Sequence, residues 1–224
     1  MSQPAPMRGR PPDPRMKEKV LLAALEVYAD SGWAGFTIDA VASKGRVGKA
    51  AIYSRWSSKE ELLVEAIRAA APEAEPMEID TSTPLRATLI AYAERLIGAL
   101  SGHLGLVMLR AQLEAKIFPD VLGAAMSSFQ MEWQAVARSV VAAAAARGEL
   151  PPTASPALVF DSVRGTIINH YLMIPGRSIE RFVGERTRYA ERLVDTVIAG
   201  LRAYSAEESD DPSWERAGVP AARP

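Results

Sequence analysis

The sequence predicts an all-α protein. Almost every periodic segment places its apolar residues three or four positions apart, and no segment alternates apolar and polar residues as a half-buried strand does. Breaks that contain glycine or proline separate these segments. Together the patterns predict about nine helices, arranged as an N-terminal three-helix helix-turn-helix domain joined to a C-terminal helical domain.

The first helices follow one another closely. A helix is expected over 15–30, with Gly32 as its C-terminal glycine. Thr37 is expected to cap a second helix. The glycine-containing turn at 45–48 then leads into a third helix over 49–56.

A fourth helix is expected to begin near Ser58, because Ser58 and Glu61 have the spacing of a capping box. The indole of Trp56 is too large for a polar turn, so we expect it in the core. These helices define a domain over 15–70. The preceding residues 1–14, rich in Pro, Gly and Arg, predict a disordered basic arm.

The rest of the chain predicts five longer helices separated by proline-containing breaks. They are expected over 84–102, 104–116, 119–147, 155–174 and 179–204. Together they form a second domain over 71–204. The residues 205–224, first acidic and then rich in Pro and Ala, predict a disordered tail.

The last two helices carry more apolar surface than packing on one side requires. The helix over 155–174 has a broad apolar arc, and the helix over 179–204 has two adjacent apolar columns. A second copy of the chain would supply a matching pair and form a four-helix interface with two-fold symmetry. We therefore expect a homodimer through these two helices, with burial inside the monomer as the alternative.

The composition excludes several classes of function. The chain has 224 residues, no cysteine and two histidines. Disulfides, thiol catalysis and zinc fingers are thereby excluded, and a histidine-rich metal site has too few ligands, so no cofactor or metal is expected. The chain lacks a run of about eighteen apolar residues and a signal-peptide core, which predicts a cytoplasmic protein without a membrane partner.

The net charge of −1 is unevenly distributed. Residues 1–70 contain eleven Lys or Arg against eight Asp or Glu, whereas residues 71–224 contain fifteen against nineteen. A basic N-terminal part on a neutral-to-acidic body has the sign expected for an N-terminal module that binds nucleic acid.

The stretch 36–61 is the most informative part of the chain. Two short helices joined by a tight glycine-containing turn, the second rich in hydrogen-bond donors, describe a helix-turn-helix that binds DNA. Lys49, Ala50 and Ser54 are expected at base edges, with Ala50 on a thymine methyl and Lys49 on guanine. Two such helices related by a dyad would enter major grooves about 34 Å apart on palindromic double-stranded operator DNA.

Four further residues are expected to bind phosphates and thereby fix the register on DNA: Tyr53, Arg55, Lys59 and Thr37. Three of them have a simpler interpretation. Tyr53 would otherwise be a core residue, and Arg55 and Lys59 would be ordinary solvated charges.

The arm carries a separate hypothesis. Arg8 and Arg10 lie in the sequence Arg-Gly-Arg-Pro, and arginine in an extended segment suits a narrow A·T-rich minor groove. Unstructured basic tails are common, and that alternative stays open.

Residues in this region also carry a family resemblance. The order of Gly32, Thr37, Ile38, Val41-Ala42, Val47, Ile52-Tyr53, Trp56, Lys59 and Leu62 resembles the DNA-binding domain of TetR-type transcriptional regulators over about 15–65. The resemblance implies an all-helical homodimer with nine or so helices per subunit. It also implies a small-molecule pocket in the C-terminal domain that controls DNA affinity, usually in a repressor.

The chain departs from the family pattern in the turn. Arg46 follows Gly45, so the turn glycine is displaced by one position, and Gly48 replaces the usual serine cap. Ala51 stands where a threonine often contacts phosphate, so that contact is not carried over. Trp56 replaces the more usual phenylalanine, a change that should preserve packing.

Nothing in the sequence identifies the effector. The candidates for ligand binding are Met108, Arg110, Phe129, Trp133, His170 and Tyr171. Most such residues are core residues, and that interpretation stands beside the pocket for each of them. A buried Arg110 would need an anionic partner.

Two other classes of function compete with a ligand-responsive regulator. One is an architectural DNA-binding protein with no small-molecule effector. The other is an α-helical enzyme, which would need clustered carboxylates, a metal-ligand set or a nucleophile with its base. The sequence shows none of these, so we expect a protein that is not an enzyme.

Overall fold

A computed structural model describes residues 14–70 and 80–204, and every regular element in those ranges is a helix. The described residues form two compact units. The first unit contains residues 14–70 and 106–125, and the second contains residues 80–105 and 126–204. The segment 106–125 therefore joins the first unit, although the sequence placed it within the second domain.

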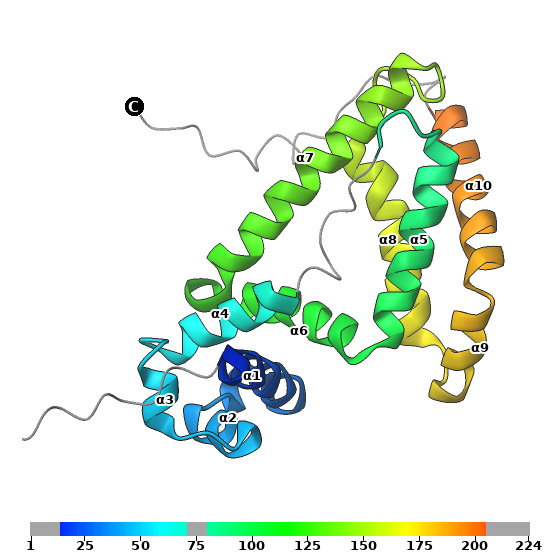
Figure 1. The fold of residues 1–224 in the computed structure, drawn as a ribbon. Helices are drawn as coiled ribbons and strands as arrows, with labels where there is room; N and C mark the ends of the chain where they lie inside the picture. The colour runs from blue at the N-terminus through cyan, green and yellow to red at the C-terminus, as the bar shows by residue number, and fades with distance from the viewer. Residues whose placement is uncertain (1–13, 71–79, 205–224) are drawn as a thin grey trace, which may run out of the picture. The chain divides into compact units, whose positions relative to one another are not determined.

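The first unit is built from α1 (Pro14–Gly35), α2 (Ile38–Gly45), α3 (Lys49–Tyr53), α4 (Lys59–Ala70), most of α6 (His103–Ile117) and the π-helical turn η2 (Pro119–Gly123). Helix α1 packs on α2 and α4, and α2 contacts α3 (Figure 1). The largest fully buried side chains in this unit are Trp56, Tyr28, Phe36, Ile52, Leu62, Leu63 and Ile67. The burial of Trp56 confirms the prediction that it is a core residue.

Local side-chain caps explain where α2 and α4 begin. The Thr37 hydroxyl accepts a hydrogen bond from the Ala40 N–H at 3.2 Å, as predicted. The Ser58 hydroxyl accepts the Glu61 N–H at 3.1 Å, also as predicted. The other half of the predicted capping box is wrong, because the Glu61 carboxylate accepts the N–H and hydroxyl of Ser57 instead, both at 2.7 Å.

Helix α1 continues past its predicted end at a kink. Gly32 has φ 64° and ψ −172°, a backbone conformation open essentially to glycine alone. The helical turn then resumes and ends at Gly35. The predicted glycine therefore breaks the helix without ending it.

The turn between α2 and α3 explains the displaced glycine. A Cβ at Gly45 would lie 3.3 Å from the Ala23 Cβ, so glycine there permits a close approach of α1. Arg46 takes the left-handed conformation, with φ 52° and ψ 46°. Hydrogen bonds from the N–H groups of Arg46 and Val47 back to α2 hold it in that conformation.

Helix α3 is shorter than predicted. It ends at Tyr53, and the next residues form a turn rather than a regular helix. The Arg55 N–H bonds the Ile52 carbonyl at 2.9 Å, and the Ser54 hydroxyl bonds the Ala51 carbonyl, which tightens the chain there.

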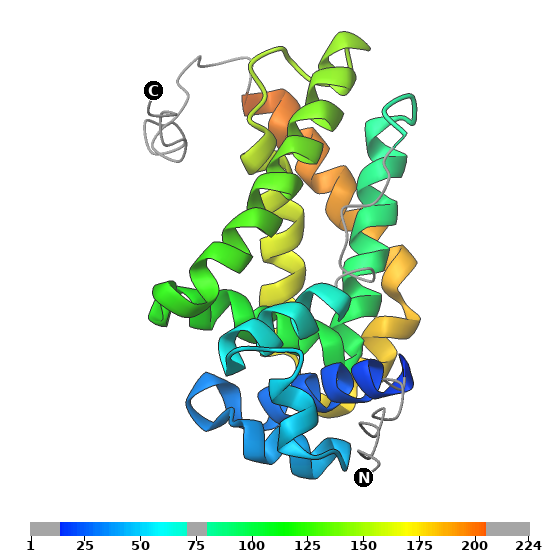
Figure 2. The same ribbon diagram turned by 60° about the vertical axis from the view of Figure 1, so that its left-hand side comes forward.

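The second unit contains α5 (Leu85–Ser101), α7 (Ala124–Ala146), α8 (Pro156–Met173), the 3₁₀ turn η3 (Gly176–Ser178), α9 (Ile179–Gly184) and α10 (Arg186–Tyr204). Helices α5, α8 and α10 pack against one another and stay together in both views (Figures 1 and 2). The single helix predicted over 179–204 is wrong. Glu185, with φ −96° and ψ 13°, separates α9 from α10 after the poor helix former Gly184.

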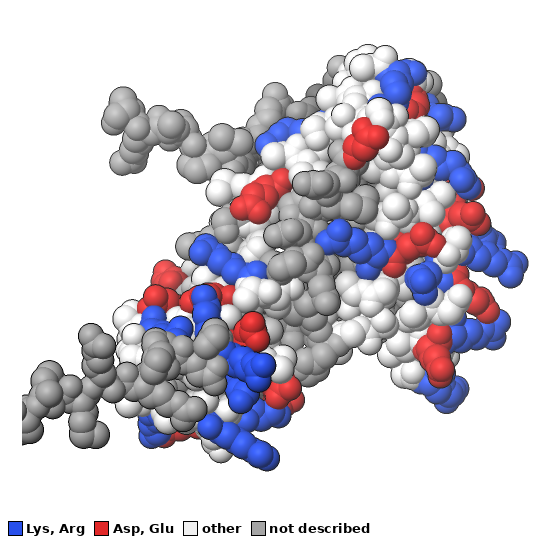
Figure 3. All heavy atoms as spheres, viewed as in Figure 1, with Lys and Arg blue, Asp and Glu red and all other residues white. Residues whose placement is uncertain are grey.

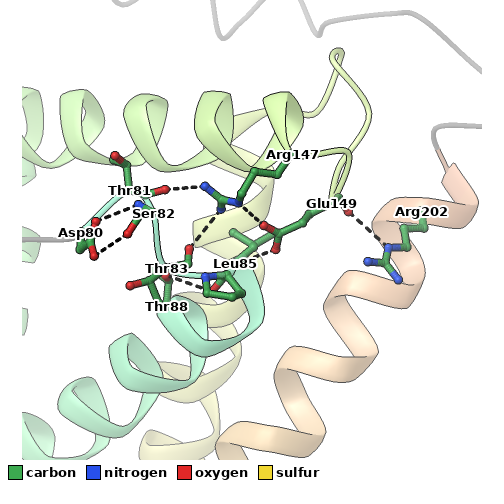
Figure 4. Close-up of polar contacts among 10 residues, drawn as sticks. Asp80, Thr81, Ser82, Thr83, Leu85, Thr88, Arg147, Glu149 and Arg202 are labelled. Atoms are coloured by element: carbon green, nitrogen blue, oxygen red, sulfur yellow. Dashed lines mark hydrogen bonds and ion pairs between the residues drawn. The ribbon is translucent and has the colours of Figure 1, made fainter.

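A polar clasp fixes the entry to α5 (Figure 4). The Arg147 guanidinium donates to the carbonyls of Thr81 and Thr83 and pairs with the Glu149 carboxylate. The same carboxylate accepts the Leu85 N–H at 2.6 Å, one of the unpaired donors in the first turn of α5. The clasp therefore binds the end of α7 to the start of α5.

Among the described helices, none is by itself long and apolar enough to cross a membrane. Helices α5 and α6 meet those criteria of length and composition only when they are counted together as a bent pair.

Candidate nucleic-acid interface

One face of helix α3 packs on the core, and the opposite face is exposed to solvent. Ile52 is fully buried and Trp56, just after the helix, is 1% exposed. The Trp56 indole N–H donates to the Glu65 carboxylate at 2.5 Å, and that carboxylate pairs with Lys17 of α1 at 2.6 Å. The buried face of α3 is thus fixed to both α1 and α4.

The side chains predicted to contact DNA lie on the outer face. Lys49, Ala50, Ser54 and Arg55 are exposed, and Tyr53 is 57% exposed, which excludes the core interpretation for Tyr53. Within the described part of the chain, Arg55 forms no ion pair. Its guanidinium is therefore available to an anion.

Lys49 has a partner that the sequence analysis did not single out. Its ammonium lies 2.7 Å from the Asp39 carboxylate in the first turn of α2. The hydrogen bond and charge of Asp39 raise the pKa of Lys49. The only sequence signal for this pair is the position of an acidic residue at a helix start, where the helix dipole favours it.

The two residues expected to bind phosphates near α2 have internal contacts as well. Thr37 is exposed, and its hydroxyl, which accepts a hydrogen bond as a cap, keeps its own O–H as a donor. The Lys59 ammonium donates to the Phe36 carbonyl at 3.1 Å and lies 4.0 Å from the centre of the Trp33 ring. Lys59 therefore holds the α1–α2 connection and is neither free in solution nor dedicated to an external anion.

Lys and Arg side chains lie on the exposed surface of the first unit. Figure 3 shows Lys and Arg side chains crowded over the face of the first unit, with some carboxylates between them. Along α10, Arg and acidic side chains alternate instead. Arg8 and Arg10 lie outside the described residues.

An ion pair from α6 stabilises the kink in α1. The Arg110 guanidinium donates to the Ala29 carbonyl at 2.7 Å, and the Glu114 carboxylate accepts the Trp33 N–H at 3.0 Å. Arg110 and Glu114 also pair with each other at 3.2 Å. Because the kink at Gly32 interrupts the helical ladder, these side chains supply hydrogen-bond partners on both sides of the break.

The anionic partner expected for Arg110 is thus Glu114, four residues along the same helix. Burial, followed by the nearby Glu114 carboxylate, raises the pKa of Tyr28 beneath this pair. Sequence reasoning missed Glu114 because its other contact is 81 residues away.

The predicted ligand-binding residues do not all lie in one unit. Met108 and Arg110 belong to the first unit, and the other four belong to the second. In the second unit, Trp133 stacks on Tyr92 at 4.9 Å between ring centroids, and Phe160 meets both rings edge-on at 5.4 Å. Trp133 of α7 thus forms an aromatic trio with Tyr92 of α5 and Phe160 of α8.

A second aromatic group surrounds His170. Its imidazole stacks on Tyr189 at 5.0 Å between ring centroids and meets Phe182 at 4.8 Å. Tyr171 is buried and Phe129 is half-buried. Tyr92, Phe182 and Tyr189 were missed as partners because their contacts depend on tertiary packing rather than on helical spacing.

Within 14–70 and 80–204, no three or more His, Asp or Glu side chains are grouped closely enough to hold a metal ion.

Comparison with known protein families matches both parts of the chain. A family model described as bacterial regulatory proteins of the tetR family matches residues 20–66. A model described as the C-terminal domain of tetracyclin repressor-like proteins matches residues 79–197.

Two curated relatives extend over most of the chain. The chain is 25% identical to YdeS of Bacillus subtilis (strain 168), named an HTH-type transcriptional regulator, over 90% of this chain and 98% of that protein. It is 28% identical to a protein of Mycobacteroides abscessus named DNA-binding transcriptional repressor TetR, over 81% of this chain and 91% of that protein.

Two solved structures share the fold. GusR of Salmonella enterica gives a TM-score of 0.64 at 16% identity, over 84% of this chain and 96% of that one. FadR of Bacillus subtilis, solved with stearoyl-CoA, gives a TM-score of 0.56 at 18% identity, over 83% of this chain and 97% of that one. With an exposed α3 on a buried three-helix core and family models that match both parts of the chain, this protein belongs to the TetR family of transcriptional regulators.

Proposed function

We propose that the protein is a ligand-responsive repressor that binds a palindromic operator as a homodimer and is released by a small molecule. The observation that carries the proposal is the outer face of α3. Its side chains are exposed while Ile52 and Trp56 hold its inner face in the core. A short helix fixed in this way presents base-reading groups at a defined orientation.

The roles on DNA follow from position. Lys49, Ala50 and Ser54 face the base edges, with Ala50 suited to a thymine methyl group. Tyr53 and Arg55 contact phosphates from the end of α3, and the Thr37 hydroxyl does so from the start of α2. Lys59 contributes mainly by fixing the α1–α2 connection, because its ammonium already binds the Phe36 carbonyl.

Arg8 and Arg10 extend the proposal to the minor groove. They precede α1 by only a few residues, so an extended arm is long enough to follow the duplex beyond the major-groove contacts. Because the proposed partner is operator DNA, we also propose that the protein acts in the cytoplasm.

Dimerisation is proposed through α8 and α10. Leu158, Leu172 and Met173 on α8 are 46%, 57% and 72% exposed. On α10, Leu193 and Val197 are half-buried. The adjacent column, Ala190, Val194 and Ile198, is buried within the unit, as is Leu201. Apolar side chains left uncovered on both helices support a two-fold four-helix interface.

The effector site is proposed in the second unit, around the residues with aromatic partners. Trp133 is half-buried within the trio with Tyr92 and Phe160, and Phe129 lies one helical turn before it. His170 and Tyr171 contribute from α8. Aromatic and apolar walls suit a ligand with apolar surface, and a fold neighbour was solved with stearoyl-CoA.

Coupling to DNA is proposed to pass through α6. This helix follows α5 in the chain and leads into η2, which contacts α4. Its Arg110 and Glu114 hold α1 at the kink. A ligand that favours a different position of α6 would therefore change the orientation of α1 and α4, and with them α3.

Selection of bound duplexes from a random library, followed by sequencing, tests the proposal. We expect one enriched palindrome whose half-sites are about one helical turn apart. Enrichment of unrelated sequences, or none, would contradict the proposed function.

An architectural DNA-binding protein is the second candidate, because the effector is inferred from aromatic packing alone. Thermal melting against a panel of apolar small molecules separates the two. A stabilising compound that also releases the enriched duplex supports the repressor, and a panel in which no compound releases the duplex supports the architectural protein.

A further inference from the structure

The surface formed by α2 and α3 contains one carboxylate among several cations. Residues 38–55 include Lys44, Arg46, Lys49 and Arg55, and the only acidic residue is Asp39. A carboxylate on a surface that approaches DNA phosphates reduces affinity by charge repulsion. Its presence therefore needs an explanation.

Folding stability does not explain the presence of Asp39. The side chains of Lys49 and Asp39 are 57% and 69% exposed. Ion pairs between exposed side chains contribute about 0–1 kcal/mol, because water and salt screen them. The pair nevertheless has good geometry at 2.7 Å and joins the first turn of α2 to the first residue of α3.

The pair changes what Lys49 can bind. An ammonium group has three donors, of which Asp39 occupies one. The other two suit O6 and N7 of a guanine, so a base contact is compatible with the pair. A lone phosphate contact that draws Lys49 away would leave the Asp39 carboxylate unpaired beside the DNA backbone.

We propose that Asp39 is a specificity-determining residue, which holds Lys49 for a base edge and penalises binding through phosphates alone. This inference rests on the proposed function of α3 as the DNA reader. It assigns selectivity to a residue that lowers affinity for DNA of mixed sequence.

The test compares Asp39→Asn with a matched control. Glu26→Gln removes the same charge from another exposed ion-pair site in the first unit, where Lys44 lies 3.3 Å from Glu26 and 3.9 Å from Asp30. Binding of both variants is measured over a range of salt on two duplexes: the one enriched by the wild-type protein and one of mixed sequence.

We expect Asp39→Asn to bind the mixed duplex about fivefold more tightly at low salt. The slope of log affinity against log salt should steepen by about 0.9, equivalent to one added phosphate contact. Affinity for the enriched duplex should change less than about twofold, so the specificity ratio falls. Glu26→Gln should change both affinities by the same factor.

A double variant keeps the result interpretable. In Lys49→Met, the further change Asp39→Asn should leave the salt slope unaltered, because no ammonium remains to be released. Thermal melting establishes that each variant is folded, and Asp39→Ser replaces Asp39→Asn if that variant is not.

Equal gains on both duplexes, or a response identical to that of Glu26→Gln, would overturn the assignment of Asp39. Failure of the wild-type protein to enrich any duplex would instead count against the proposed function, so the two failures are distinct.

Discussion

Two Arg–Glu pairs, one in each unit, make the same set of contacts in different surroundings. In each pair the arginine donates to the backbone, Arg110 to one carbonyl and Arg147 to two, and the glutamate accepts a backbone N–H. The pair in the first unit lies at a kink inside α1, and its Glu114 side chain is 13% exposed. The pair in the second unit lies at the start of α5, and its Glu149 side chain is 24% exposed.

The two backbone sites differ in how much they depend on their Arg–Glu pair. The unpaired N–H groups at a helix start can bind water or another capping group. At the kink, by contrast, the ends of the Arg110 and Glu114 side chains fill the space beside Gly32. The kink in α1 therefore depends on its Arg–Glu pair more than the start of α5 depends on Arg147 and Glu149. Aromatic contacts occur in both units, between Tyr28, Trp33 and Phe36 in the first and between Tyr92, Trp133 and Phe160 in the second.

Gly32→Ala should produce the largest effect. A Cβ there would lie 2.5 Å from both the Arg110 Nη2 and the Glu114 Oε1, in a conformation that alanine avoids. We expect a loss of about 3 kcal/mol or more in the free energy of unfolding, measured by urea denaturation. Gly98→Ala in α5, where no atom lies within 4 Å, should instead be neutral or stabilising by up to about 1 kcal/mol. Equal responses would show that the kink is not required.

Removal of each glutamate compares the two pairs directly. Glu114→Ala leaves the Trp33 N–H and the Arg110 guanidinium without their carboxylate and should cost about 2 kcal/mol. Glu149→Ala should cost about 1 kcal/mol, because its site is more exposed to water. Denaturation curves of the two variants give both values, and a larger loss for Glu149→Ala would reverse the comparison.

Acid should weaken the second pair. Burial raises the pKa of Glu149, but hydrogen bonds from Arg147 and the Leu85 N–H outweigh it and leave the pKa below its ordinary value. The folded state therefore binds this proton less readily than the unfolded chain. The resulting stability is present above about pH 5 and is lost as the pH falls through the folded-state value. The difference in Tm between wild type and Glu149→Gln should shrink between about pH 5 and pH 3, whereas a constant difference would contradict this assignment.

Arg46→Gly should give the smallest effect and the opposite sign. Glycine adopts the left-handed conformation without the steric cost that Arg46 bears. We expect a gain of up to about 1 kcal/mol in stability, seen as a raised Tm. A lowered Tm would mean that the arginine side chain stabilises the turn by a contact of its own.

The sequence predicted features that depend on neighbouring residues. The Thr37 cap, the buried Trp56 and the glycine at the α1 break each follow from a residue type at a local position. The two-fold dimer and the palindromic operator remain predictions.

Features that depend on distant residues could not be predicted in this way. Arg110 was expected to bind an anion, but only folding brings it and Glu114 to the kink in α1. The break before α10 follows from the backbone conformation of Glu185, and the early end of α3 from local hydrogen bonds, and neither is visible in the apolar spacing. The ligand candidates were chosen by residue type, and folding divided them between two units.

The central claim, that the exposed face of α3 reads DNA, is tested most directly by a pair of alanine variants. Tyr53 and Met131 are exposed to similar extents, 57% and 62%, but only Tyr53 lies on α3. On the duplex enriched by wild type, Tyr53→Ala should bind at least about tenfold more weakly with an unchanged Tm, and Met131→Ala should bind as wild type does. Wild-type affinity in Tyr53→Ala, or an equal loss in both variants, would contradict the account.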